Sequence, residues 1–68
     1  SLNAEKNIRS IREKEAESNF NIARFYEKQR VFDSARIYYN DIIDNYPDTS
    51  WASQSVARLQ VMEHKNEK

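Results

Sequence analysis

The sequence of 68 residues contains no cysteine and no glycine, and only one proline and one histidine. Without cysteine the chain can form neither a disulfide nor a thiolate metal site, and a single histidine argues against structural zinc. The lack of glycine and the rarity of proline argue against sheets joined by tight turns. Strong helix formers such as alanine, glutamate, lysine and arginine are plentiful instead. We therefore expect an all-α fold with no metal and no cofactor.

Charge and hydrophobicity argue against a nucleic-acid partner and against a membrane-spanning helix. The chain has 11 basic and 11 acidic residues, without the concentrated basic stripe that is typical of nucleic-acid binding. No apolar run approaches the roughly 20 residues that a membrane-spanning helix needs. We expect no nucleic-acid partner and no membrane span in this chain, and we expect it to be a piece of a longer protein.

Hydrophobic periodicity predicts three helices, which cover about residues 3–29, 32–45 and 50–63. Neither glycine nor proline interrupts the first helix, so it is expected to be long. Its apolar positions are sparse before Ala16 and dense after it. Pro47 is expected to end the second helix, because proline lacks the N–H donor and disfavours helical geometry in the residue before it.

The second and third helices each carry an apolar stripe with the spacing of one helix face. The stripe of the second helix holds Phe32, Ala35, Tyr39, Ile42, Ile43 and Tyr46. The stripe of the third helix holds Ala52, Val56, Leu59 and Met62. We interpret the aromatic residues of these stripes, together with Tyr26, as core rather than as a cofactor-binding cluster.

The two turns carry helix-end signals. Lys28 and Arg30 suit a helix C-terminus, where cations meet the negative end of the helix dipole. Arg30 occupies a position where glycine commonly provides left-handed geometry, so this turn is either strained or of another geometry. Asp33 and Ser34 are expected to cap the second helix, and the polar residues 48–50 are expected to cap the third.

An internal repeat organises the chain. A shift of 34 residues places residues 22–25 (Ile-Ala-Arg-Phe) on residues 56–59 (Val-Ala-Arg-Leu), and 34 residues is the period of the tetratricopeptide repeat (TPR). The prediction is a TPR-like solenoid fragment. It divides into a helical extension at 1–15, one full repeat at 16–49, the first or capping helix of a following repeat at 50–64, and a disordered tail at 65–68.

The residues of this repeat also resemble a known family. The segments that carry the resemblance are 21–26, 32–36, 46–49 (Tyr-Pro-Asp-Thr), 51–52 and 57–59. They resemble the C-terminal repeats of the BamD-type outer-membrane assembly lipoproteins. Asn19 departs from the pattern, because many repeats have tryptophan there. Similar Tyr-Pro-Asp-Thr endings also occur in other periplasmic repeat proteins, including the coordinator that works with the Tol–Pal system.

The resemblance implies a location and a kind of work. It implies a lipid-anchored protein on the periplasmic face of the bacterial outer membrane, in the machine that inserts β-barrel proteins. It implies that the partners are protein subunits or peptide segments. An alternative is a homotypic structural module or a generic TPR adaptor.

The sequence offers no convincing catalytic set. His64 lies in a charged C-terminal stretch, and its spacing from the serine residues does not indicate a catalytic pair. Asp41 and Asp44 lie one turn apart, and we interpret them as an outward, solvated pair rather than a cation site. We therefore predict that the chain is not an enzyme.

The candidate functional residues concern protein binding. The first helix of each pair in a TPR array lines the concave groove, and the predicted groove residues here are Phe20, Arg24, Glu27, Lys28, Trp51, Gln54 and Arg58. Two of these, Arg24 and Arg58, lie 34 residues apart and are expected to stack in register, where they could hold a carboxylate.

Alternatives remain for the charged and aromatic groove residues. Arg24 could pair locally with Glu27 or Glu17, and Arg58 with a carboxylate of the tail. Trp51 is either an exposed interface anchor or a structural residue packed on Pro47 and Tyr46.

Self-association is the last expectation. Ile8 and Ile11 share a face of the first helix. They are expected to pack on a preceding repeat or on a second copy of the chain, because solenoid units need neighbours to bury their faces. The isolated chain is accordingly expected to form a homo-oligomer through its first helix or to have low stability.

Overall fold

The computed structural model describes the backbone of residues 2–65 and the side chains of residues 5–65. It contains the helices α1 (Leu2–Lys28), α2 (Phe32–Asn45) and α3 (Ser50–Lys65), joined by two short turns. The predicted all-α, TPR-like architecture of three helices with a long first helix is confirmed.

The third helix is longer than expected. It continues through His64 to Lys65, where basic side chains are favoured by the negative end of the helix dipole. Lys65 is therefore helical and not part of a tail. The rest of the predicted tail, residues 66–68, lies outside the described residues.

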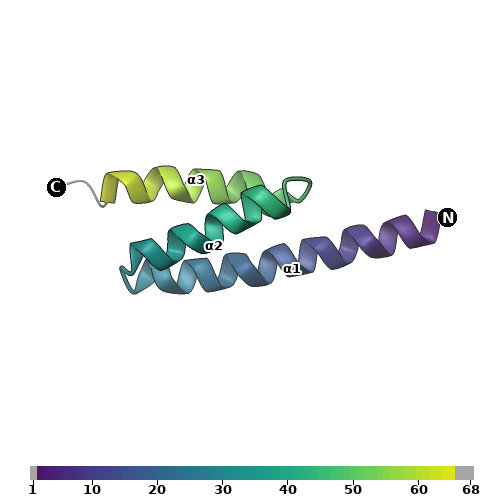
Figure 1. Ribbon diagram of the computed structural model, residues 1–68, viewed down its shortest axis with the longest axis horizontal. Coiled ribbons are helices and arrows are strands. Elements are labelled where there is room, and N and C mark those ends of the chain that lie inside the picture. Colours follow the sequence, from purple (N-terminus) through teal and green to yellow (C-terminus); the bar gives the residue numbers. More distant parts are fainter. Residues whose placement is uncertain (1, 66–68) are drawn as a thin grey trace.

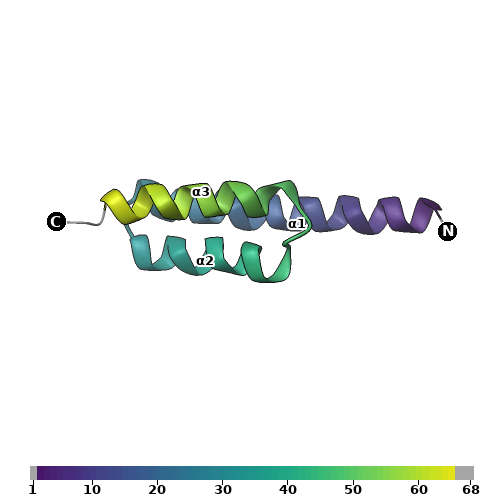
Figure 2. The same cartoon turned by 90° about the horizontal axis from the view of Figure 1, so that it is seen from above.

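The helices form an elongated assembly in which α1 and α3 run in the same direction and α2 runs opposite to both (Figure 1). The view from above shows α2 to one side of the other two helices (Figure 2). Helix α3 contacts both α1 and α2. The N-terminal part of α1 extends beyond the other helices in both views, and the longest dimension is 52 Å.

The core lies where the three helices meet. The ring of Tyr39 is fully buried and packs edge-on against Phe20, with ring centroids 5.5 Å apart. Ala23 and Ala35 are fully buried, and their small side chains allow α1 and α2 to approach closely. The buried apolar residues are Ala16, Phe20, Ala23, Ala35, Tyr39, Ile42 and Met62. Tyr26, Phe32 and Tyr46 pack against them, so the aromatic residues belong to the core as predicted.

The buried stripe of α3 differs from the prediction. Val56 is 42% exposed, whereas the unexpected Ser55 is fully buried. The hydroxyl of Ser55 donates to the carbonyl of Trp51, 2.8 Å away and one turn earlier. Ser55 can therefore face the core because its own helix supplies the acceptor.

The turn between α1 and α2 has left-handed geometry at a residue other than glycine. Arg30 has a φ of 64°, and two backbone hydrogen bonds close the helix end: Arg30 N–H to the carbonyl of Glu27 (3.0 Å) and Val31 N–H to the carbonyl of Tyr26 (2.9 Å). This pair of bonds is a Schellman motif. A residue with a Cβ in this conformation carries a cost of about 1–2 kcal/mol. The turn is therefore strained, one of the two options that the sequence left open.

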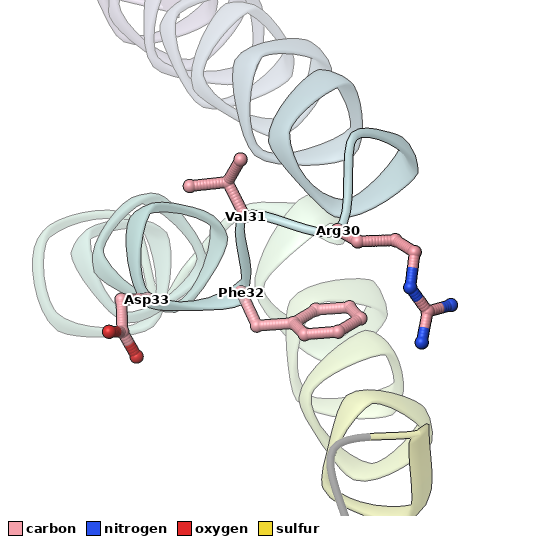
Figure 3. A pocket seen from close by; sticks show the side chains of 4 residues that line it. All are labelled: Arg30, Val31, Phe32 and Asp33. Atoms are coloured by element: carbon pink, nitrogen blue, oxygen red, sulfur yellow. The ribbon is translucent and has the colours of Figure 1, made fainter.

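The start of α2 is not capped as expected. Val31 occupies the N-cap position, without a side-chain hydrogen bond, and Ala35 N–H donates to its carbonyl. Asp33 lies inside the first turn of the helix and pairs with Arg36. Residues 30–33 line a hollow of about 260 Å³ at this turn. Figure 3 shows their side chains, and the guanidinium of Arg30 lies 5.4 Å from the ring centroid of Phe32.

Two residues of α1 hold the turn between α2 and α3. Arg12 donates to the carbonyl of Asn45 (2.7 Å) and to both carboxylate oxygens of Asp48 (2.9 and 2.5 Å). This pairing holds the pKa of Asp48 below its ordinary value. Glu13 accepts hydrogen bonds from the backbone N–H (3.2 Å) and hydroxyl (3.0 Å) of Ser50. The start of α3 is therefore capped by a carboxylate of α1, with the charge that a helix N-terminus favours.

The three side chains at 48–50 that were expected to cap the third helix make other hydrogen bonds instead. The carboxylate of Asp48 binds Arg12, and the hydroxyl of Thr49 donates to the carbonyl of Tyr46 (2.7 Å). The hydroxyl of Ser50 donates to Glu13 instead of accepting from its own helix. The prediction of a cap from these side chains is therefore wrong.

Candidate protein-binding site

Glu27, in the last turn of α1, is a buried carboxylate with several partners. Its side chain is only 1% exposed. Tyr39 donates its hydroxyl to Oε1 at 2.7 Å. Arg24 and Arg58 donate to the same oxygen at 3.1 Å each, and Arg58 makes a second bond to Oε2. The ammonium of Lys65 lies 3.5 Å from Oε2.

We call these five residues the Glu27 cluster: Glu27, Arg24, Tyr39, Arg58 and Lys65. Every helix contributes to it. Arg24 and Glu27 are three residues apart on α1, and Arg58 and Lys65 are seven residues, or two turns, apart on one face of α3. The cluster therefore links all three helices through one carboxylate.

Burial and hydrogen bonding set the ionisation of the two acidic members. Burial raises the pKa of Glu27, but hydrogen bonds from Arg58, Tyr39 and Arg24 outweigh it and lower the pKa to about 2. Burial and the neighbouring Glu27 carboxylate raise the pKa of Tyr39 to about 12. Glu27 is therefore an anion and Tyr39 a neutral donor throughout the neutral pH range.

Two predicted groove residues lie inside the assembly. Phe20 and Glu27 are buried, although the sequence predicted that they line an open groove. Trp51 is half-buried, and its ring lies 5.0 Å from that of Phe20. Trp51 thus packs against the core through Phe20, which fits the structural alternative.

The other predicted groove residues remain accessible. Lys28 and Gln54 are exposed, and the side chains of Arg24 and Arg58 are 32% and 28% exposed. Arg24 makes the local pair with Glu27 that was one of its alternatives. Arg58 crosses from α3 to the same carboxylate, which the sequence did not predict.

Two members of the cluster, Tyr39 and Lys65, were missed as functional candidates. A signal for the cluster was present, because Glu27 continues the apolar stripe of Ala16, Phe20 and Ala23. A carboxylate on a buried stripe requires partners. The sequence alone could not say that α3 brings those partners, because this depends on how the helices pack.

Asp41 also differs from its prediction. It is partly buried rather than outward, and it accepts hydrogen bonds from Asn19 (3.0 Å) and Asn45 (2.7 Å). Asn19, which replaces the tryptophan common in such repeats, therefore links α1 to α2 by a polar bond. Asp44 is exposed as expected.

The described residues form neither a metal-binding cluster nor a membrane-spanning helix. Across this part of the chain, no group of three or more His, Cys, Asp or Glu side chains could hold a metal ion. None of the three helices is long and apolar enough to cross a membrane, as far as the described residues show.

These observations define an all-α module in which a TPR-like hairpin and a third helix meet at a buried, fully paired carboxylate. A family model described as outer membrane lipoprotein, YfiO, matches residues 1–68. The chain therefore belongs to the YfiO family of outer membrane lipoproteins. Comparisons with curated proteins and with solved structures gave no match.

Proposed function

We propose that this chain is a protein–protein interaction segment of a lipoprotein that takes part in the assembly of β-barrel proteins in the bacterial outer membrane. The observation that carries the proposal is the family match across residues 1–68. The Tyr-Pro-Asp-Thr segment at 46–49 and its neighbours, which resemble BamD-type proteins, support the same assignment. The segment would work on the periplasmic face of that membrane.

The repeat organisation is part of the proposal. Residues 16–49 would form one TPR unit, residues 50–64 the first helix of the next, and residues 1–15 an extension. The parallel course of α1 and α3 supports this division, because equivalent helices of successive repeats run in the same direction (Figure 1).

The binding surface would lie along α1 and α3. We call it the α1–α3 face and define it by Arg24, Lys28, Gln54, Arg58 and Lys65. Phe20, Glu27 and Trp51 support it from within, through ring packing and the paired carboxylate. The partners would be protein subunits or peptide segments. The chain would act without catalysis, cofactor or nucleic acid.

A depletion experiment tests the proposed function. The lipoprotein that contains this chain is depleted in its bacterium, and folded β-barrel proteins in the outer membrane are followed by their heat-dependent migration on gels. The proposal predicts that folded β-barrel proteins fall while lipoproteins of unrelated function stay constant. Normal β-barrel levels after complete depletion would contradict it.

Self-association is a second candidate function that one observation favours. Ile8 and Ile11, in the N-terminal half of α1, are 59% and 56% exposed. Large apolar side chains that share one helix face often mark an interface. A second copy of the chain could cover them.

A further inference from the structure

The Glu27 cluster carries more positive than negative charge. Three cations, those of Arg24, Arg58 and Lys65, surround the single carboxylate of Glu27. Tyr39 adds no charge because its raised pKa keeps it neutral. The balance is three positive charges minus one negative charge, a net charge of +2.

Hydrogen bonds already occupy most of the Glu27 carboxylate. Its two oxygens accept four hydrogen bonds, one each from Tyr39 and Arg24 and two from Arg58. A carboxylate offers about four acceptor sites. Three of the four bonds end on Oε1, and the Lys65 ammonium lies 3.5 Å from Oε2. Little of the carboxylate is therefore left for the remaining N–H groups of the two arginines.

Those remaining donors are numerous. Arg24 uses one nitrogen, Nη1, for Glu27, and Arg58 uses Nε and Nη2, although each guanidinium carries five N–H groups. Among residues 5–65, no second carboxylate lies within ion-pair distance of Arg24, Arg58 or Lys65. The face thus presents donors that lack an anionic acceptor within the described part of the chain.

The spare donors are reachable and held in place. The side chains of Arg24, Arg58 and Lys65 are 32%, 28% and 45% exposed. Glu27 holds both guanidinium groups from the buried side. The two arginine side chains would therefore lose little conformational entropy when an anion binds them. A guanidinium suits a carboxylate in particular, because its fork can donate two parallel bonds.

We propose that the α1–α3 face binds an acidic peptide segment, whose carboxylates pair with Arg24, Arg58 and Lys65. The inference rests on the proposed function and specifies the chemistry of its partner. A flat anionic membrane fits less well, because such surfaces attract clusters of 4–8 exposed basic residues, as a rough guide. Here the three cations are partly buried between α1 and α3, and carboxylates on flexible side chains can reach them.

The test measures binding of a labelled, end-blocked peptide of alternating alanine and glutamate to the 68-residue chain, by fluorescence anisotropy at low salt. The control peptide has glutamine for every glutamate. Arg24→Gln/Lys65→Gln removes two positive charges from the face. Lys14→Gln/Arg36→Gln removes two positive charges elsewhere, which leaves the same net charge.

The acidic peptide is expected to bind, and the glutamine peptide is not. Loss of Arg24 and Lys65 should weaken binding about fivefold, whereas the matched double variant should stay within about twofold of the original. Lys65→Gln alone, which leaves both arginine pairs intact, should give part of the effect even if the double variant unfolds.

Several outcomes would overturn the inference. One is equal weakening in both double variants, which would indicate attraction by overall charge. Others are equal binding of the glutamine peptide, or tighter binding to phosphatidylglycerol vesicles than to the acidic peptide. If any of these occurs while depletion still lowers folded β-barrel proteins, the partner chemistry is wrong and the proposed function stands.

Discussion

At the scale of single residues, Glu27 shows how a charge can be buried in so small an assembly. Removing a carboxylate from water costs several kcal/mol unless hydrogen bonds and opposite charges replace the lost water. Tyr39, Arg24 and Arg58 supply them. Within the described residues, no buried side-chain nitrogen or oxygen lacks a hydrogen-bond partner.

The lowered pKa of Glu27 makes the free energy of unfolding depend on pH. Because the folded pKa of about 2 lies below the ordinary 4.5, the stabilisation from Glu27 is complete above about pH 4.5 and is lost as the pH falls toward 2. The difference corresponds to a stabilisation on the order of 3 kcal/mol at neutral pH.

Glu27→Gln is expected to lower the free energy of unfolding at pH 7 by about 2–3 kcal/mol, because it leaves two arginines without their anion. Urea unfolding followed by circular dichroism, at several pH values, measures this. The gap between the variant and the original should close toward pH 2. Glu63→Gln, which changes an exposed carboxylate of α3, is the control, and a gap that stays constant with pH would count against the assignment.

Arg30→Gly is expected to raise the free energy of unfolding by about 1 kcal/mol, because glycine adopts the observed φ of 64° without the Cβ penalty. Thermal and urea unfolding report the change. Arg30→Ala keeps the penalty and removes only the contact with the ring of Phe32, so it should not stabilise. Equal stability of the glycine and alanine variants would disprove a strained turn.

At the scale of elements, α1 organises the other two helices at two places. Near its C-terminus it provides Glu27, and near its middle it provides Arg12 and Glu13, which hold the α2–α3 turn. Residues 1–15 were predicted as an extension of the repeat. Arg12 and Glu13 nevertheless determine how α3 begins.

Glu13→Gln is expected to lower the free energy of unfolding by about 0.5–1 kcal/mol, because it removes the negative charge from the start of α3. A double-mutant cycle with Ser50→Ala tests whether the two residues act together. The cycle should show a coupling energy from the hydroxyl bond, because Ser50→Ala removes the hydroxyl donor to Glu13 and keeps the backbone N–H. Purely additive effects would show that the hydroxyl bond contributes nothing, and Glu17→Gln is the control for charge.

The sequence predicts the elements better than their connections. Periodicity, Pro47 and the 34-residue repeat suffice for three helices and most of the core, because these signals act within one element. The cap from Glu13 was missed because its partner lies 37 residues away. The Arg58–Glu27 pair was missed for the same reason, since 31 residues separate the two. The buried position of Ser55 depends on how α3 turns toward its neighbours.

At the scale of the whole molecule, the chain buries few apolar side chains and leaves several large ones exposed to solvent. A domain of this size has a small core and is marginally stable by itself. Ile8, Ile11 and Ile37 are all more than half exposed. Helix α1 also extends beyond its partners, so part of its surface receives no cover from α2 or α3.

Self-association is predicted to use Ile8 and Ile11. Sedimentation velocity at rising concentration should show oligomers of the original chain, and Ile8→Ser/Ile11→Ser should shift them toward monomer. Ile37→Ser, on the outer side of α2, is the control and should change little. A monomeric original chain with a melting temperature well above about 60 °C would contradict both self-association and marginal stability.

The central claim is that the α1–α3 face binds protein in the envelope, and site-specific photo-crosslinking in living cells tests it most directly. A photoreactive phenylalanine analogue replaces Gln54, exposed on that face, or Ile37, exposed on α2, in the lipoprotein that contains this chain. The account predicts a discrete protein crosslink from position 54 that Arg24→Gln/Lys65→Gln weakens, and none of similar strength from position 37. Crosslinks from position 37 alone would contradict it.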